Sequence, residues 1–142
     1  MAEKASERHK EDEMRQILVN LKYLESQMAA VQAQLQVLER GLIEIGTTKT
    51  SLESIKDLKK DVSSLYPLGS GMFAKGTLAK QDKLLVDVGA GAIIEKYIPD
   101  AEKILASRES DIRTNITNYQ GLLSNLEKQY NDLAEKARSL TG

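Results

Sequence analysis

The chain has 142 residues, which at the usual size of about 100–200 residues per domain allows one domain and leaves no room for a second large one. Its 20 Lys and Arg residues against 21 Asp and Glu residues give a formal net charge of -1, which argues against nucleic-acid binding. It has no Cys and a single His, His9, so disulfides, thiol nucleophiles and most metal sites are not expected.

The first part of the sequence predicts a polar tail followed by a long helix. Residues 1–13 carry charges of both signs and almost no apolar side chains, so they either form a solvated helical extension or are disordered, and we predict disorder. From Ile17, apolar residues then alternate four and three positions apart for four heptads, the repeat of a coiled-coil seam. A weaker continuation extends the predicted helix over 14–65, where Tyr66-Pro67 closes it. The seam residues of the four clear heptads are Ile17, Leu21, Leu24, Met28, Val31, Leu35, Leu38, Leu42 and Ile45.

The middle of the sequence changes to a period of two, which is typical of strands. Residues 68–98 hold five of the nine glycines. Gly69-Ser70-Gly71 and Gly89-Ala90-Gly91 each stand between apolar, strand-like flanks, which predicts two tight turns. We therefore expect two β-hairpins, with strands at about 64–68, 71–79, 83–88 and 92–98.

A second long helix is predicted over 99–141. Pro99 suits the first turn of a helix, and Asp100 complements the positive end of the helix dipole. A clean four-three repeat runs from Ile116 to Leu140, so the two helices are able to pair in antiparallel fashion. The predicted fold class is mainly α: a long antiparallel coiled-coil hairpin with two β-hairpins inserted at the chain reversal, with residues 14–142 forming a single domain.

This pairing also predicts an apolar free end. With the reversal placed at the hairpins, Leu140 lies opposite about Leu24. The residues predicted to project past the end of the partner helix are Met14, Ile17, Leu18, Val19 and Leu21. Leu18, Val19 and Leu122 widen the apolar stripes beyond what a two-helix seam covers. A third helix or an oligomeric partner explains such a surface as well as a binding function does.

The predicted hairpins require partners. Short strands on one chain leave unpaired edges and apolar faces that aggregate unless other chains cover them, which predicts oligomerisation through the hairpins. The interface residues expected from this argument are Phe73, Leu84, Val86, Val88, Ile93 and Ile94.

The sequence shows no motif that would carry catalysis. Residues 69–74 fit the spacing G-x-G-x-x-A of dinucleotide-binding loops, but the following residues continue as a strand and no helix opens there. We therefore predict no enzymatic activity, no cofactor and no metal. No apolar run approaches the ~18 residues that span a bilayer, and the first fifteen residues lack the apolar centre of a signal peptide, so we expect a soluble, cytoplasmic protein without a membrane partner.

The order of these elements resembles the prefoldin alpha subunits, both the archaeal ones and the eukaryotic subunit 5. The resemblance covers residues 14–140 and is carried by the stretches PLGSGMFAKG and LLVDVGAGAIIEK between two long heptad helices. Alpha-class subunits of this family carry two hairpins and beta-class subunits carry one, so the two glycine turns point to the alpha class.

The resemblance implies an ATP-independent molecular chaperone, a holdase that captures unfolded proteins at coiled-coil tips and delivers them to a group II chaperonin. It implies a hexamer of two alpha and four beta subunits, joined through the hairpins. The alternative is a structural coiled-coil scaffold subunit that binds one dedicated partner. The residues expected to bind clients, the tip residues, are Met14, Ile17, Leu18, Leu21, Leu24, Leu126, Tyr130, Leu133 and Leu140.

Overall fold

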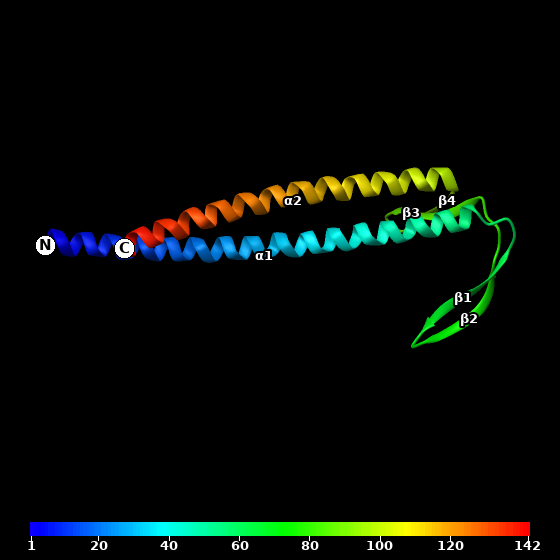
Figure 1. Ribbon diagram of the computed structural model, residues 1–142, viewed down its shortest axis with the longest axis horizontal. Helices are drawn as coiled ribbons and strands as arrows, with labels where there is room; N and C mark the ends of the chain where they lie inside the picture. The colour runs from blue at the N-terminus through cyan, green and yellow to red at the C-terminus, as the bar shows by residue number, and fades with distance from the viewer. The chain divides into compact units, whose positions relative to one another are not determined.

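The computed structural model describes residues 1–142 and consists of two long helices with two β-hairpins between them in the sequence (Figure 1). This confirms the predicted fold class. The chain forms two compact units, residues 1–41 with 112–142 and residues 42–111. The elements are α1 (Ala2–Lys56), β1 (Val62–Gly69), β2 (Met72–Leu78), β3 (Lys83–Gly89), β4 (Ala92–Tyr97) and α2 (Ile98–Thr141).

Both predicted ends of the first helix are corrected by the structure. The polar tail is helical, because α1 begins at Ala2. Residues 2–13 contain no Gly or Pro and are rich in Ala, Glu, Lys and Arg, which are good helix formers, so the helix propagates through them although residues 2–12 are all exposed. At the other end α1 stops at Lys56 rather than at 65. The apolar spacing of Val62 and Leu65 still fits the seam repeat, but from Val62 the burial alternates with a period of two, so that Val62 and Ser64 face the same side of β1.

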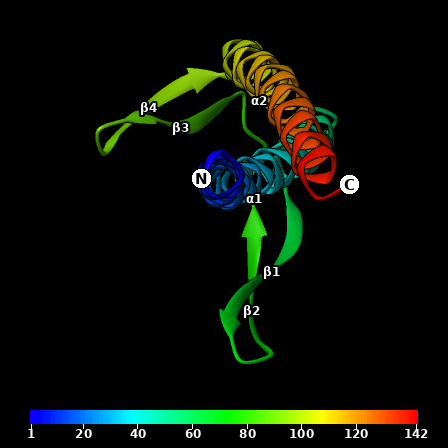
Figure 2. The ribbon, with the colours of Figure 1, turned by 90° about the vertical axis from the view of Figure 1, so that its left-hand side faces the viewer.

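The hairpins are two separate two-stranded antiparallel sheets, β1–β2 and β3–β4, drawn as distinct ribbons in Figure 2. The first pairs Val62 with Leu78 through to Pro67 with Phe73, and the second pairs Lys83 with Tyr97 through to Asp87 with Ile93. The prediction of two hairpins is thus confirmed.

Each hairpin closes through the predicted glycine turn. The two central residues of each turn have positive φ, between 52° and 79°. They are Ser70 and Gly71 in the first hairpin and Ala90 and Gly91 in the second. Such angles at both central residues define a type I′ turn, whose twist matches that of paired strands. Glycine adopts them without steric cost, whereas Ser70 and Ala90 do so at a cost of roughly 1 kcal/mol.

The only buried side chains lie along the helix seams. Every predicted seam position from Ile17 to Ile45 is buried or half-buried, as is every position of the repeat from Ile116 to Leu140. No polar or charged side chain is buried. The core is therefore a pair of apolar stripes, as the heptad repeats predicted, and neither hairpin contributes a buried residue to it.

Candidate interaction surfaces

The first unit places most tip residues inside the helix seam. Ile17 and Leu24 are buried, with 3% and 6% of their surface exposed. Leu18 is the exception, since 51% of its surface is exposed. The half-buried tip residues are Met14, Leu21, Leu126, Tyr130, Leu133 and Leu140.

The expectation that apolar residues project past the end of the partner helix is wrong. The ammonium group of Lys136 lies 3.2 Å from the carboxylate of Glu13, so the last turns of α2 run beside that part of α1 and cover Ile17. The predicted register failed because α1 ends nine residues earlier than 65, which shifts α2 toward the N-terminal end of α1. The segment of α1 that remains uncovered is residues 1–12, which are all exposed and are mostly polar.

A polar contact between the two helices supports this register. The hydroxyl of Tyr130 donates a hydrogen bond of 3.0 Å to the carboxylate of Glu25. This hydrogen bond, followed by the negative charge of Glu25 and by slight desolvation, raises the pKa of Tyr130 above its ordinary value. Tyr130 therefore fixes the alignment of the helices within the first unit in addition to filling the seam.

Several large apolar side chains of the first unit remain exposed. Val19, Tyr23 and Val37 expose 61%, 63% and 55% of their surface, and Leu122 on α2 exposes 43%. Leu18, Val19 and Leu122 were recognisable in the sequence because they flank seam positions. Tyr23 and Val37 were missed, although their signal was present: each lies two residues after a seam position, on the opposite face of the helix.

The second unit exposes most of the predicted oligomer interface. Phe73, Val88, Ile93 and Ile94 are exposed, with Phe73 and Ile93 above half of their surface, and Leu84 and Val86 are half-buried. Val86 lies directly opposite Ile94, and Leu84 stands on the same face two residues earlier. Ile93 pairs with Asp87 on the other face, and Phe73 belongs to the first hairpin. The predicted residues thus occupy both hairpins and both faces of β3–β4.

The unsatisfied surface of the hairpins is larger than the sequence indicated. Each sheet has only two strands, so every strand leaves one edge without backbone partners. Further exposed apolar side chains of these strands are Leu65, Leu68, Met72, Leu85 and Tyr97. Such edges and faces are typical of strands that pair with another chain.

Two contacts connect the second hairpin to α2. The Arg108 guanidinium donates to the backbone carbonyl of Asp87, and the Ile98 amide donates to the Asp82 carbonyl at 3.0 Å. The Asp87 carboxylate in turn accepts from the Gly89 amide at 2.9 Å, just before the turn. These contacts orient β3–β4 against the first turns of the helix.

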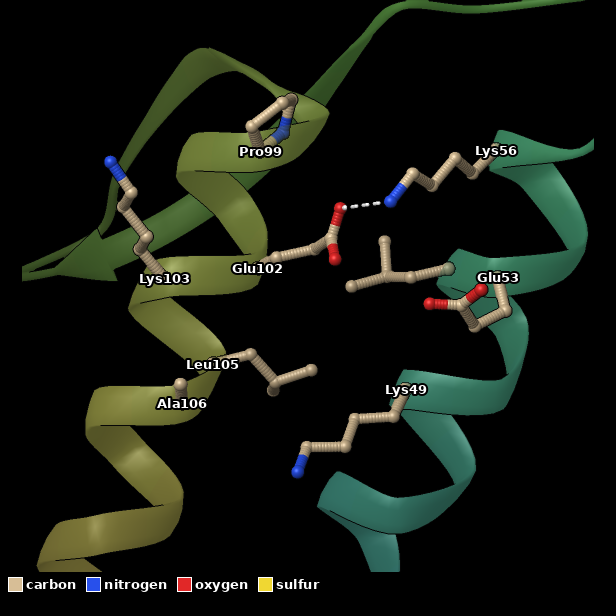
Figure 3. Close-up of a pocket in the computed structure, with 9 residues that line it drawn as sticks. Lys49, Glu53, Lys56, Pro99, Glu102, Lys103, Leu105 and Ala106 are labelled. Atoms are coloured by element: carbon tan, nitrogen blue, oxygen red, sulfur yellow. Dashed lines mark ion pairs between the residues drawn. The ribbon is translucent and has the colours of Figure 1, made fainter.

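A cavity of about 590 Å³ lies between α1 and α2 in the second unit (Figure 3). Leu52 and Leu105 line it, and Glu102 reaches across it to Lys56 at 3.4 Å. Lys49 also pairs with Glu109. Because Lys49, Lys56 and Glu102 are already engaged in ion pairs that hold the helices together, we interpret this cavity as a structural gap in the seam.

No helix of the chain is both long and apolar enough to cross a membrane. No cluster of three or more His, Asp or Glu side chains has a geometry that would hold a metal ion.

Comparison with known proteins places this architecture in one family. Residues 24–142 match the prefoldin family, described as "Prefoldin subunit". The chain is 28% identical to prefoldin subunit alpha of Pyrococcus horikoshii, over 90% of this chain and 87% of that protein. It is 30% identical to prefoldin subunit alpha of Thermoplasma acidophilum, over 82% and 89%.

A solved structure shows the same fold. The cryo-EM structure of filamentous prefoldin from Methanocaldococcus jannaschii superposes with a TM-score of 0.71 at 21% identity, covering 81% of this chain and 95% of that chain. Two long helices, two intervening hairpins and the sequence match over most of the chain agree with one another. The chain therefore belongs to the prefoldin family of chaperone subunits and groups with the alpha subunits.

Proposed function

We propose that this chain is a subunit of an ATP-independent holdase that captures unfolded polypeptides near the free ends of its helices. The observation that supports this most directly is the exposure of Leu18, Val19 and Tyr23 on a unit whose seam is already filled. A folded chain that needs no further apolar contact there still presents a cluster of them, and non-native proteins offer matching apolar segments. Each methylene group buried in such a contact gains roughly 0.8 kcal/mol.

The tip residues contribute to this proposed surface in two ways. Leu18 is accessible in the closed seam, and the half-buried Met14, Leu21, Leu126 and Leu133 present their outer edges. Ile17 and Leu24 are available to a client only if the two helices part locally, which the fraying of helix ends allows. We therefore place the first contact at Leu18, with the remaining tip residues recruited as the seam opens.

The hairpins carry the proposed assembly. Their open edges and apolar faces support pairing with beta-class prefoldin subunits in a hexamer of two alpha and four beta subunits. Several weakly binding arms around one client raise the apparent affinity through effective concentration while each contact still releases rapidly. Such release suits the transfer of clients to a group II chaperonin in the cytoplasm.

The test is the aggregation of a denatured protein diluted into buffer without ATP, followed by light scattering. The chain is first assembled with a beta-class subunit of an archaeal relative. We expect suppression by the native complex and at least a threefold loss of suppression for the Leu18→Ser, Val19→Ser, Tyr23→Ser variant. The control is Ile43→Ser, which removes a still more exposed apolar side chain from the second unit and should leave suppression unchanged.

The same assay separates the holdase from the scaffold alternative. A complex of correct mass that fails to suppress aggregation would contradict the holdase and favour a subunit that binds one dedicated partner. Equal loss of suppression for the triple variant and for Ile43→Ser would contradict the position of the client surface.

A further inference from the structure

The face of α1 opposite the seam carries a second heptad repeat. Its members each lie two residues after a seam position, about 200° around the helix, and they also alternate four and three residues apart. All of them are exposed and all belong to the first unit. This outer stripe consists of Val19, Tyr23, Ser26, Ala30, Ala33 and Val37.

The outer stripe differs in charge from an ordinary solvated helix face. No Asp, Glu, Lys or Arg occurs anywhere in residues 26–38, although 29% of the whole chain is charged. The same four-three series continues to Gln16 on one side and to Arg40 on the other, so polar residues bound it at both ends. A bounded, charge-free stripe with a coiled-coil period indicates a surface that receives another helix.

The side chains of the outer stripe are complementary in size to those of a second copy running in the opposite direction. When residue i faces residue 56 minus i, Val19 meets Val37. In the same register the large Tyr23 meets the small Ala33, and Ser26 meets Ala30. A twofold axis repeats each pair in both copies, as an isologous interface requires. Small residues at the centre allow the two helix backbones to approach closely.

Other registers are less favourable. A shift by one heptad in one direction places Asp12 against Val37, and a shift in the other direction places Glu44 against Val19. A parallel arrangement stacks Tyr23 on Tyr23 and Ala30 on Ala30, which alternates crowded layers with empty ones and leaves gaps that close packing does not tolerate. Of these arrangements, only the antiparallel register with Val19 opposite Val37 both keeps charged side chains out of the interface and gives layers of similar side-chain volume.

We propose that the outer stripe is a self-association surface, through which α1 of one chain pairs antiparallel with α1 of a second copy between Val19 and Val37. The inference goes beyond client binding, and because Val19 and Tyr23 belong to both surfaces, a second copy and a client compete for them. It also assigns a function to Val37, which neither the intramolecular seam nor the proposed client surface uses.

Cysteine crosslinking tests this register directly, because the chain contains no Cys. Full-length chain with Ser26→Cys is mixed with differently tagged full-length chain carrying Ala30→Cys, and disulfides are formed under mild oxidation. We expect the mixed crosslink at a yield at least tenfold above that of a mixture of Val19→Cys and Ala33→Cys, which are out of register. Circular dichroism establishes that each variant keeps its helix content.

A charge variant provides the second readout. Ala33→Glu, added to both crosslinking partners, should lower the mixed yield at least fivefold, because it buries a carboxylate against Tyr23 of the other copy. Gln32→Glu, one residue away and off the stripe, is the matched control and should leave the yield unchanged. Equal yields for the in-register and out-of-register mixtures, or a highest yield between two chains both carrying Ser26→Cys, would overturn the proposal.

Discussion

The helix seam of the first unit and the hairpins of the second satisfy their apolar surface in opposite ways. Along the seam, Ile17, Leu24 and Val31 are each at most 6% exposed, so the chain supplies its own partner. In the hairpins, Phe73 and Ile93 expose 60% and 64% of their surface and each sheet ends after two strands. A seam needs only two helices, whereas an isolated two-stranded sheet is marginally stable in water. The fold thus concentrates its dependence on other chains in the hairpins.

The sharpest way to break this comparison is to charge a hairpin face. Val86→Asp together with Ile94→Asp places two carboxylates on neighbouring positions of β3 and β4. We expect association with a beta-class subunit to weaken at least hundredfold, because the charges would be buried without partners, while the helix content stays unchanged. Sedimentation velocity measures the assembly and circular dichroism measures the helices.

Leu85→Asp identifies which face of β3–β4 is covered in the assembly, since Leu85 is on the opposite face of β3 and is 72% exposed. If Leu85→Asp abolished assembly and the double variant did not, the interface would lie on the other face. If neither variant weakened assembly, the β3–β4 hairpin would not form the interface between subunits.

A cavity in the seam should have the next largest effect, and it should act on the chain by itself. Leu24→Ala removes a side chain that is 6% exposed and leaves a gap between α1 and α2. We expect a loss of about 2–3 kcal/mol in the free energy of unfolding, the lower part of the range for buried leucines because the seam is thin. Urea unfolding followed by circular dichroism measures it.

Leu18→Ala is the matched control, because the same atoms are removed from a side chain that is half exposed. Its cost should stay below about 0.5 kcal/mol. Equal losses for both variants would mean that the seam does not stabilise the first unit.

Replacing a glycine by alanine should change stability in opposite directions in the helix and in the hairpin, and Gly46 and Gly76 test this. A Cβ atom at Gly46 in α1 would meet no atom within 4 Å, so Gly46→Ala should stabilise the helix by up to about 1 kcal/mol. A Cβ atom at Gly76 in β2 would clash with Cε2 of the Tyr66 ring, so Gly76→Ala should lower hairpin stability by about 1–3 kcal/mol. Thermal unfolding of both variants measures the two shifts, and shifts of the same sign would mean that the Tyr66 ring does not pack on Gly76 in solution.

The sequence predicted the elements well because their signals are local. Heptads indicated the seam, and the repeated Gly-small-Gly sequences indicated both hairpins. Glycines at these positions permit the positive φ angles that a tight turn requires, and the structure has them there. The resemblance carried by these same motifs led to the correct family.

The helix ends and the register were not predictable in the same way. Val62 and Leu65 fit a heptad continuation and also fit a strand, and only pairing with β2 decides between the two. The predicted register depended on the predicted end of the first helix. The error in that boundary therefore placed Ile17 at the free end of the seam, whereas the structure has it in the interior. Whether the tip residues bind clients remains a prediction.

The smallest expected effect concerns the polar contact that aligns the two helices. Tyr130→Phe removes the hydrogen bond to Glu25 but keeps the ring in the seam. Because the folded-state pKa of Tyr130 lies above the value of about 10 for an unfolded tyrosine, the bond contributes its full stability below pH 10 and loses it as the pH rises through the folded-state pKa. The difference in melting temperature between wild type and Tyr130→Phe should therefore be small and constant from pH 7 to about pH 9 and should vanish at higher pH. Tyr23→Phe, which changes an exposed hydroxyl in the same unit, should show no difference at any pH. A difference for Tyr130→Phe that grew with pH would mean that the bond is stronger to the phenolate than to the phenol, which the negative charge of Glu25 forbids.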